Sequence, residues 1–222
     1  MKDLLSSTIL PHHCCSCGKI GSILCEYCKY DIVTDMTAQC FACLRPVGRA
    51  GDVCSGCQAK VPYARAWYVG PHTGVLRELV MRYKFQRMRS ASKLLAELLC
   101  EVVPQLPPGM VVTWVPTIRS HVRQRGYDHA ALLATEFARL QQCEAAPALA
   151  RTGKTVQRGA TRAERIAQAA HAFMASKVQP RPYIVIDDVA TTGASVQAAA
   201  KALKDAGATM VWVLTVTRDP LE

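Results

Sequence analysis

The feature that most constrains the fold of this chain is an apolar run that leads into two adjacent carboxylates and then into a turn of small residues. The stretch reads Tyr183-Ile184-Val185-Ile186-Asp187-Asp188-Val189-Ala190-Thr191-Thr192-Gly193-Ala194-Ser195. Apolar residues then recur with a helical period up to Gly207, and a second apolar run covers residues 210–216, which predicts one strand–helix–strand unit. An uninterrupted apolar strand is buried on both faces, which is typical of a parallel sheet. We therefore predict an α/β domain with the turn at the carboxyl edge of its sheet, where ligands of such folds bind.

The small-residue turn is a predicted anion-binding site. Between Thr191 and Ser195, several backbone N–H groups can converge at the N-terminus of the following helix, where the helix dipole favours negative charge. Asp187 and Asp188 precede the turn and can accept hydrogen bonds from sugar hydroxyls or hold Mg²⁺ through water. Together these groups suit a ribose phosphate. The alternative, an ordinary buried strand with a polar turn, explains the apolar run but not the paired acids beside a glycine-containing turn.

This stretch resembles the 5-phosphoribosyl-1-pyrophosphate (PRPP) motif of type I phosphoribosyltransferases, which has four apolar residues, two acids and then Thr-Thr-Gly. In that family the acid pair contacts the ribose 2′- and 3′-hydroxyls, and the following loop grips the 5′-phosphate. The resemblance implies that Asp187 and Asp188 are catalytic residues and that PRPP binds with Mg²⁺. It assigns PRPP and phosphate binding to Asp187, Asp188, Val189, Ala190, Thr191, Thr192, Gly193, Ala194 and Ser195.

Length and composition exclude several classes of protein. A chain of 222 residues is long enough for one domain of usual size plus a small appendage. Half of its residues are apolar and a fifth are charged, which excludes a disordered chain. No apolar run reaches the roughly eighteen residues of a transmembrane helix. The segment from Leu4 to Leu10 is too short and too polar for a secretory signal, so we expect a cytoplasmic protein without a membrane span.

The positive charge of the chain is uneven and favours phosphate-bearing ligands. Residues 1–62 hold six Lys and Arg against five Asp and Glu, which leaves twenty-one against twelve, a net charge of +9, for the remainder. Residues 82–89, which interleave aromatics, are expected to be a basic loop that meets phosphates or stacked bases. Residues 116–126 are expected to be a flexible basic loop that binds pyrophosphate; a solvated loop is the alternative for both. Residues 149–165 can form a lid over a diphosphate. The predicted phosphate-binding side chains in these segments are Lys84, Arg119, Arg123, Arg125, Arg151 and Lys154.

Nine of the eleven cysteines lie between residues 14 and 57, where they form four C-x-x-C pairs. A C-x-x-C turn directs two thiolates at one ion, and two such turns complete a closed tetrahedral zinc site of the structural kind. Eight ligands predict two zinc ions; sequential pairing gives the shortest loops, and interleaved pairing stays open. Redox chemistry and disulfides are alternatives, but four pairs in a loop-rich segment do not resemble a thioredoxin-type motif. The predicted ligands are Cys14, Cys17, Cys25, Cys28, Cys40, Cys43, Cys54 and Cys57.

Periodicity and capping signals predict further elements along the chain. They are a strand over residues 63–70, a helix after the N-cap candidate Thr73, a helix over residues 90–103, a strand over residues 110–115, a helix capped by Asp128, and a short helix that ends at Phe173.

Taken together, these pieces resemble the ComF family of phosphoribosyltransferase-like proteins, which is associated with competence. The resemblance covers nearly the whole chain. It departs from the family pattern at Asp128 and Gln168, where Asn is usual, and at Gln86-Arg87-Met88, where Arg-Gly-Asp is usual; these departures bear on the choice of base or acceptor. The matching residues besides the cysteines and the acid motif are Tyr83-Lys84-Phe85, Val115-Pro116, Arg125-Gly126-Tyr127, Arg151, Thr155, Gln157, Arg162 and Arg165.

The resemblance implies two domains and a function. Residues 63–222 should form a type I phosphoribosyltransferase-like parallel sheet with helices on both faces, and residues 1–62 a double zinc ribbon. It implies PRPP binding, with transfer of a phosphoribosyl group to a nitrogen acceptor, in a protein of DNA uptake or processing. No residue is an evident general base, so two alternatives stay open: a sensor of PRPP or a nucleotide without turnover, and an adaptor that binds single-stranded DNA or DNA-uptake proteins.

We predict two tightly bound zinc ions per chain, because the four pairs supply eight thiolates within forty-four residues. Metal binding, worth on the order of 10–16 kcal/mol in small zinc modules, would stabilise a segment that has few bulky apolar residues. Metal analysis of protein purified without added zinc measures the number of ions. One ion per chain would contradict one of the two predicted sites, and a folded, reduced protein without metal would contradict both. Cys40→Ser or Cys54→Ser should unfold the ribbon while the α/β domain keeps its helical circular-dichroism signal.

Overall fold

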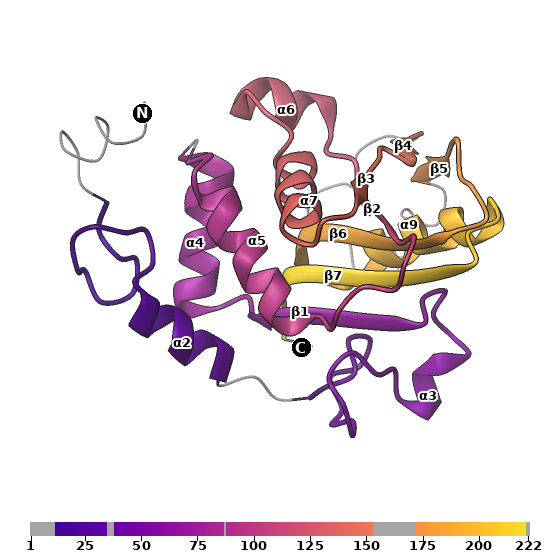
Figure 1. Cartoon of the computed structure of the whole chain (residues 1–222), viewed down its shortest axis with the longest axis horizontal. Coiled ribbons are helices and arrows are strands. Elements are labelled where there is room, and N and C mark those ends of the chain that lie inside the picture. Colours follow the sequence, from indigo (N-terminus) through magenta and orange to yellow (C-terminus); the bar gives the residue numbers. More distant parts are fainter. Residues whose placement is uncertain (1–11, 35–37, 87, 153–171, 221–222) are drawn as a thin grey trace.

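The α/β domain is built on a parallel sheet, as the sequence predicts (Figure 1). The computed structural model describes residues 12–34, 38–86, 88–152 and 172–220. Within these ranges one sheet has the order β1-β7-β6-β2-β3, and each neighbouring pair is parallel. Its strands are β1 (Arg65–Pro71), β2 (Val111–Trp114), β3 (Glu144–Ala145), β6 (Pro182–Ala190) and β7 (Met210–Arg218).

Different helices cover the two faces of the sheet, because the side chains of β6 alternate between them. Ile184 and Ile186 pack in one apolar cluster with residues of α4, α5 and α7, whereas Tyr183 and Val185 pack in a second cluster with α9. No helix in the described ranges is long and apolar enough to span a membrane. The bounds are α4 (Gly74–Phe85), α5 (Ala91–Val102), α7 (His129–Leu140) and α9 (Ala194–Asp205).

Two cysteine-rich modules precede the sheet in the chain and contact different parts of it. The first module, residues 12–34, contains α2 (Glu26–Thr34) and lies beside α5 (Figure 1). Lys29 of this module pairs with Glu97 of α5 at 3.2 Å. Buried residues of the first module belong to the same apolar cluster as α5, so the domain boundary between residues 62 and 63 stays a prediction.

The second module, residues 38–61, contains α3 (Ser55–Gln58) and lies along β1. Ala66 of β1 donates its N–H to the Gly51 carbonyl at 3.0 Å. Gly51 has a φ of +86°, and a Cβ atom there would lie 2.1 Å from the Trp67 indole. Only glycine therefore allows the module to approach the strand this closely.

The basic segment after β2 is a helix, so the flexible loop expected there is wrong. Residues Arg119–Arg125 form α6, and Gly126 ends it with a φ of +81° while donating its N–H to the Val122 carbonyl at 2.8 Å. Arginine and glutamine are good helix formers, and glycine at a left-handed C-cap ends a helix readily. Local propensity and the cap therefore decide the structure of this segment.

Two other expectations differ from the structure, and a third agrees with it. The helix α4 continues to Phe85, so Arg82 and Lys84 lie in its last turn and not in a loop. Phe173 begins a strand, so the helix expected to end there is wrong at that residue. The strand β5 (Phe173–Ala175) pairs in antiparallel fashion with β4 (Leu149–Arg151), which supplies its backbone hydrogen bonds. Asp128 caps α7 as predicted, because its Oδ1 atom accepts the Ala131 N–H at 3.2 Å.

Candidate functional site

The acid pair lies inside β6, because this strand continues past it to Ala190. Neighbouring side chains of a strand point to opposite faces, so Asp188 shares the face of Ile186 and Asp187 faces the α9 side. The Asp188 side chain is only 3% exposed, whereas Asp187 is partly exposed. The sequence places the two acids at the strand end; the longer strand gives them separate environments.

Asp188 is an internally paired carboxylate. Its Oδ1 atom lies 2.9 Å from Lys84 Nζ, and its Oδ2 atom lies 2.8 Å from His129 Nε2. Burial alone would raise the pKa of Asp188, but the charge of Lys84 and the contact with His129 outweigh burial and hold the pKa well below its usual range. Asp188 is therefore ionised, and its oxygens are engaged by the protein itself.

His129 is a site residue that sequence analysis missed. Arg125 donates from Nη1 to His129 Nδ1 at 2.8 Å, and because a guanidinium only donates, the imidazole proton lies on Nε2, toward Asp188. The Tyr83 hydroxyl donates to the His129 carbonyl at 2.7 Å, which fixes the start of α7. The available signal was its position directly after the cap residue Asp128, at the buried start of a helix.

Asp187 is the acid with oxygen atoms left for a ligand. Within the described residues its side chain accepts the Asp188 N–H at 2.9 Å. Burial and the neighbouring charge of Asp188 raise the pKa of Asp187, and Lys84 only partly opposes them. Burial lowers the pKa of Arg151, which the negative charge of Asp187 opposes, so these two side chains lie within electrostatic reach of each other.

The predicted anion site is a short turn between β6 and α9. Gly193 sits in the left-handed region with a φ of +76°, and α9 begins at the next residue. The Thr192 hydroxyl accepts the Ala194 N–H at 3.3 Å, while Thr191 is exposed. The structure thus places the 191–195 turn at the N-terminus of a twelve-residue helix and directly after the strand that carries the acids.

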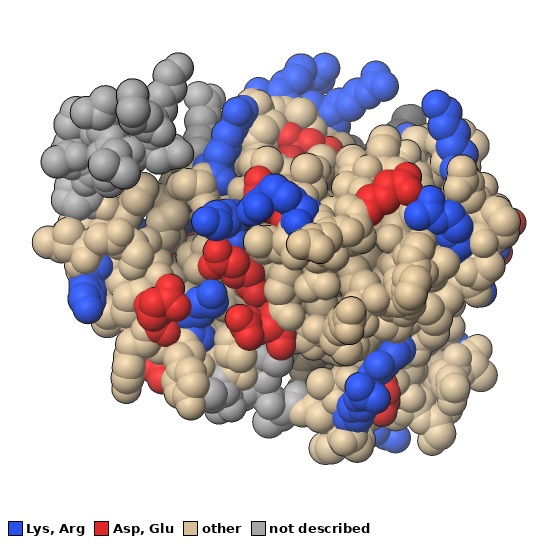
Figure 2. All heavy atoms as spheres, in the orientation of Figure 1, with Lys and Arg blue, Asp and Glu red and all other residues tan. Residues whose placement is uncertain are grey.

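The structure brings some of the predicted basic residues to the acids and leaves others apart. Lys84 and Arg125 belong to the Asp188 cluster, and Arg151 of β4 lies within electrostatic reach of Asp187. Arg119 and Arg123 are exposed on α6, in the region where basic side chains gather at the upper edge of Figure 2. Lys154 lies outside the described residues, as do Thr155, Gln157, Arg162, Arg165 and Gln168 of the family pattern.

Polar residues at the ends of β1 and β7 complete the edge that carries the site. Thr217 Oγ1 lies 2.8 Å from His72 Nδ1 and 3.4 Å from the Asp188 carbonyl oxygen. Arg218, the last residue of β7, is buried beside the end of β6 and donates to the Ala190 carbonyl at 3.3 Å. These residues were also missed, although they follow an apolar run that predicts a strand ending at this edge.

The two cysteine groups have the geometry of metal sites. In each group the four sulfur atoms lie within 4.8 Å of one another, and the pairing is sequential. Cys17 and Cys25 are 3.7 Å apart between sulfurs, and Cys43 and Cys54 are 3.5 Å apart. A zinc–sulfur distance of about 2.3 Å makes the edge of a tetrahedron about 3.8 Å, so the donor sets fit zinc. The groups are Cys14, Cys17, Cys25 and Cys28, and Cys40, Cys43, Cys54 and Cys57.

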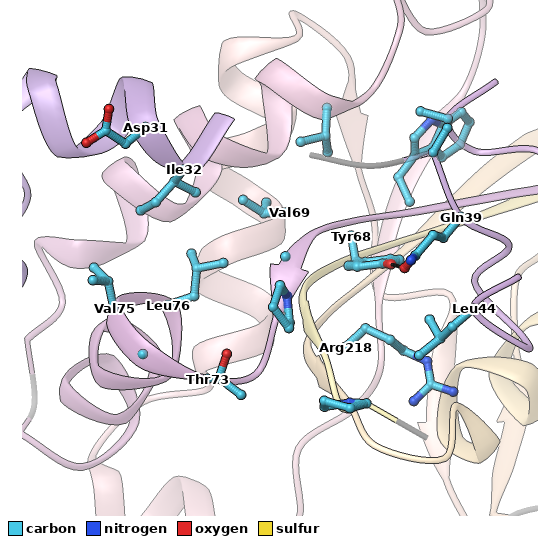
Figure 3. Close-up of a pocket in the computed structure, with 18 of the residues that line it drawn as sticks. Asp31, Ile32, Gln39, Leu44, Tyr68, Val69, Thr73, Val75, Leu76 and Arg218 are labelled. Carbon is cyan, nitrogen blue, oxygen red and sulfur yellow. Dashed lines mark hydrogen bonds between the residues drawn. The ribbon is translucent and has the colours of Figure 1, made fainter. Parts of the chain in front are cut away.

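Two hollows lie away from the acid pair. A cleft of about 850 Å³ opens between the two modules and β1, and its walls include Ile32, Tyr68 and Arg218 (Figure 3). A shallower groove of about 740 Å³ lies over α5 and α7, where its lining includes Arg89 and Lys93.

Comparison with known proteins gives relatives over most of the chain. No protein-family model matches it. The chain is 31% identical over 208 residues to the DNA utilization protein YhgH of Escherichia coli K12, which covers 87% of this chain and 90% of the relative. It is 30% identical over 207 residues to the protein of the same name in Shigella flexneri, with 88% and 90% covered.

Two solved structures are similar in part. Orotate phosphoribosyltransferase from Aeropyrum pernix has a TM-score of 0.40 and 18% identity, covering 60% of this chain and 63% of that one. The allosteric regulatory enzyme of purine biosynthesis has a TM-score of 0.43 and 21% identity, covering 61% of this chain and 29% of that one.

The two acids should differ in their effect on stability. Asp188→Asn is expected to lower the free energy of unfolding by about 3 kcal/mol at neutral pH, because it leaves the largely buried Lys84 without its carboxylate. Asp187→Asn should cost less than about 1 kcal/mol, because burial and Asp188 already disfavour its charge.

Urea unfolding followed by circular dichroism measures both variants. Since the pKa of Asp188 is lowered in the folded chain, its stabilising effect is present at neutral pH and is lost as acid protonates it. The difference between wild type and Asp188→Asn should therefore shrink in acid. Equal losses in the two variants at neutral pH would contradict the assignment.

Proposed function

The chain belongs to the ComF family, as does the DNA utilization protein YhgH, and from this premise we propose that it binds PRPP at the carboxyl edge of β6. The observation that supports the proposal best is the partly exposed Asp187, which lies three residues before the end of the strand that leads into a helix-terminal turn. Arg151 lies within electrostatic reach of this carboxylate. A ribose phosphate presents hydroxyls and a phosphate to these two kinds of group.

The two acids have different roles in this proposal. Asp187 accepts hydrogen bonds from the ribose hydroxyls, because its oxygens are not held by a basic side chain at bonding distance among the described residues. Asp188 acts through its partners: it holds Lys84 and His129, and His129 in turn orients Arg125. Asp188 is therefore a positioning residue.

Transfer of the phosphoribosyl group to a nitrogen acceptor is the enzymatic part of the proposal. As the bond to pyrophosphate breaks, positive charge grows on the ribose ring, and the carboxylate of Asp187 stabilises it. Arginine binds phosphate oxygens in bidentate fashion, so Arg151 and Arg125 are the residues proposed to receive the pyrophosphate. Asp187 would also hold Mg²⁺ through water, and the ion would neutralise charge on the pyrophosphate.

The cysteine groups are proposed to hold two structural zinc ions. Four thiolates leave no open coordination position, so the metal takes no part in the reaction. Thiolate metal sites persist in a reducing compartment, and a cytoplasmic location is therefore part of the proposal.

PRPP with Mg²⁺ should bind the wild-type protein, and Asp187→Asn should weaken binding about 10- to 100-fold. A hydrogen bond to a charged group contributes roughly 1.5–3 kcal/mol, which corresponds to this range. Isothermal calorimetry measures the affinity. The matched control is Asp205→Asn, since Asp205 is an exposed carboxylate at the far end of α9.

Three results separate the candidate functions. Undiminished affinity in Asp187→Asn would show that PRPP binds elsewhere. Release of pyrophosphate in the presence of PRPP and one nucleobase from a screen identifies an enzyme and its acceptor. Tight binding without release for any base leaves a PRPP sensor.

Binding of single-stranded DNA is a second candidate function, favoured by an exposed aromatic side chain. Phe85 at the end of α4 is 55% exposed, and the Arg125 guanidinium lies 5.0 Å from its ring centroid. Aromatic rings beside basic side chains stack bases and contact the backbone of single strands. Among the basic residues expected to help, Lys84 is engaged by Asp188, Arg82 pairs with Glu78 at 2.7 Å, and Arg87 lies outside the described residues.

The basic residues that remain for DNA line the groove over α5 and α7. Arg89 lies over the Tyr127 ring at 5.0 Å and donates to the Gly126 carbonyl at 2.8 Å, so its guanidinium is held at the groove. Lys93 lines the same groove, as does Arg139, whose Nε atom pairs with Glu136 at 3.0 Å. We propose that a strand stacked on Phe85 continues along this groove.

The salt dependence of DNA binding tests this proposal. If four phosphates are neutralised, the logarithm of the affinity should fall against the logarithm of salt concentration with a slope of about −3, at about −0.7 per contact. The double variant Arg89→Ala with Lys93→Ala should flatten the slope by about 1.4. Lys201→Ala, which removes an exposed lysine from α9, should leave it unchanged. Fluorescence anisotropy of a labelled oligonucleotide measures the slopes with and without saturating PRPP.

No binding at low salt, or complete displacement of the oligonucleotide by PRPP, would remove DNA as an independent ligand.

A further inference from the structure

A buried arginine joins the second module to the proposed phosphate site. Arg218 is 1% exposed, and its guanidinium donates to three backbone carbonyls. The acceptors are Phe41 at 3.1 Å, Ala190 at 3.3 Å and Asp219 at 3.2 Å. Phe41 belongs to the second module and Ala190 ends β6, so one side chain connects segments that are far apart in the sequence.

The Phe41 carbonyl of the second module, which accepts from Arg218, is positioned by the cysteine group. Phe41 follows the ligand Cys40 directly and lies in the same C-x-x-C turn as Cys43. Its ring is buried, lies 5.5 Å from the Arg218 guanidinium, and packs edge-on against Tyr63 at 6.0 Å. A metal ion that closes this C-x-x-C turn therefore also fixes the carbonyl that holds Arg218.

The other end of the connection supports both sides of the 191–195 turn. The Ala190 carbonyl accepts from Arg218 and also from the Asp219 N–H at 2.9 Å, which fixes the residue before the turn. The Phe41 ring lies close to Gly193 within the turn, since a Cβ atom built at Gly193 would lie 3.7 Å from Phe41 Cε1. Both contacts depend on Phe41 of the second module, through the Arg218 side chain at Ala190 and through the Phe41 ring at Gly193.

Figure 3 shows how this arrangement is placed in the fold. Arg218 extends toward Leu44 of the second module, while Tyr68 of β1 reaches Gln39 beside it, with a hydrogen bond of 2.6 Å. The cleft that these residues line separates them from Ile32 of the first module. The second cysteine group therefore lies on the side of the cleft that carries Arg218, and the first group lies on the other side.

We propose that Arg218 is a positioning residue for the 191–195 turn, and that it acts through Phe41, so that zinc in the second module holds the turn ready for a phosphate. The part of this inference that concerns PRPP rests on the proposed function. An anion nest binds well only when its N–H groups are already ordered, because ordering them on binding opposes association. Loss of metal from the second module should release Phe41, then Arg218, and then the turn.

Two variants test the connection at its two ends, and one serves as a matched control. Arg218→Lys keeps the charge but not the bonds to three carbonyls. Cys54→Ser opens the second cysteine group. The control is Arg65→Lys, because Arg65 also joins the second module to the sheet, through the Ala50 carbonyl at 3.0 Å, but lies at the other end of β1.

Hydrogen exchange of the backbone amides measures how well the 191–195 turn is ordered, and the measurement needs no ligand. In Arg218→Lys and in Cys54→Ser, amides 191–195 should exchange at least tenfold faster while those of β6 and β7 between residues 183 and 214 change less than twofold. The double variant should be no faster than the faster single one, since both break the same connection. Arg65→Lys should leave the turn within twofold of wild type.

Binding and metal content complete the test. Arg218→Lys should keep two zinc ions and bind PRPP with Mg²⁺ about tenfold more weakly than wild type by calorimetry. If wild type does not bind PRPP, the proposed function fails, and the exchange result still decides the connection. If Arg218→Lys does not fold, Cys54→Ser decides it. Unchanged exchange in the turn, or an equal rise in turn and strands, overturns the inference.

Discussion

The burial of a carboxylate inside the sheet is the constraint on which the arrangement of this molecule depends. An isolated buried charge is costly, so Asp188 requires partners from the elements packed over it. Lys84 comes from the last turn of α4, and His129 comes from the first turn of α7. Both helices therefore dock on one face at a fixed height relative to the carboxyl edge. The same pairing leaves Asp187, on the opposite face, partly exposed and without a basic side chain at bonding distance among the described residues.

The parts of the molecule that the sequence predicts well are those with a local signal. The unit around Gly193 follows from periodicity and a small-residue turn, and the sulfur groups follow from C-x-x-C spacing. The basic composition of Arg119–Arg125 favours a loop, but helix propensity and a glycine cap make this segment a helix. The inward orientation of Asp188 depends on where its strand ends, and the role of His129 depends on partners from distant elements. Neither has a local signal.

Two cysteine groups with the same ligands lie in different structural surroundings. The first module packs mainly through apolar residues onto α5, and Lys29 adds one ion pair with Glu97. The second module buries the Phe41 ring in the apolar cluster on the other face of the sheet, and it adds directional polar contacts, which include the Gly51 carbonyl on β1 and the Phe41 carbonyl on Arg218. Apolar packing tolerates small shifts, whereas a hydrogen bond depends on direction. The second module is thus the one whose position is defined closely relative to the sheet.

The contact between Gly51 and β1 has a consequence for the fate of the protein in the cell. β1 is the last strand at its side of the sheet, and such edges can pair with strands of other molecules and start aggregation. The second module blocks this edge, since Gly51 takes up the Ala66 N–H and Gln39 bonds Tyr68. Because a cysteine group holds the module together, shortage of metal would uncover a strand that carries Trp67, Tyr68 and Val69. A metal ion held by this cysteine group would thereby protect the domain against aggregation without contacting the sheet.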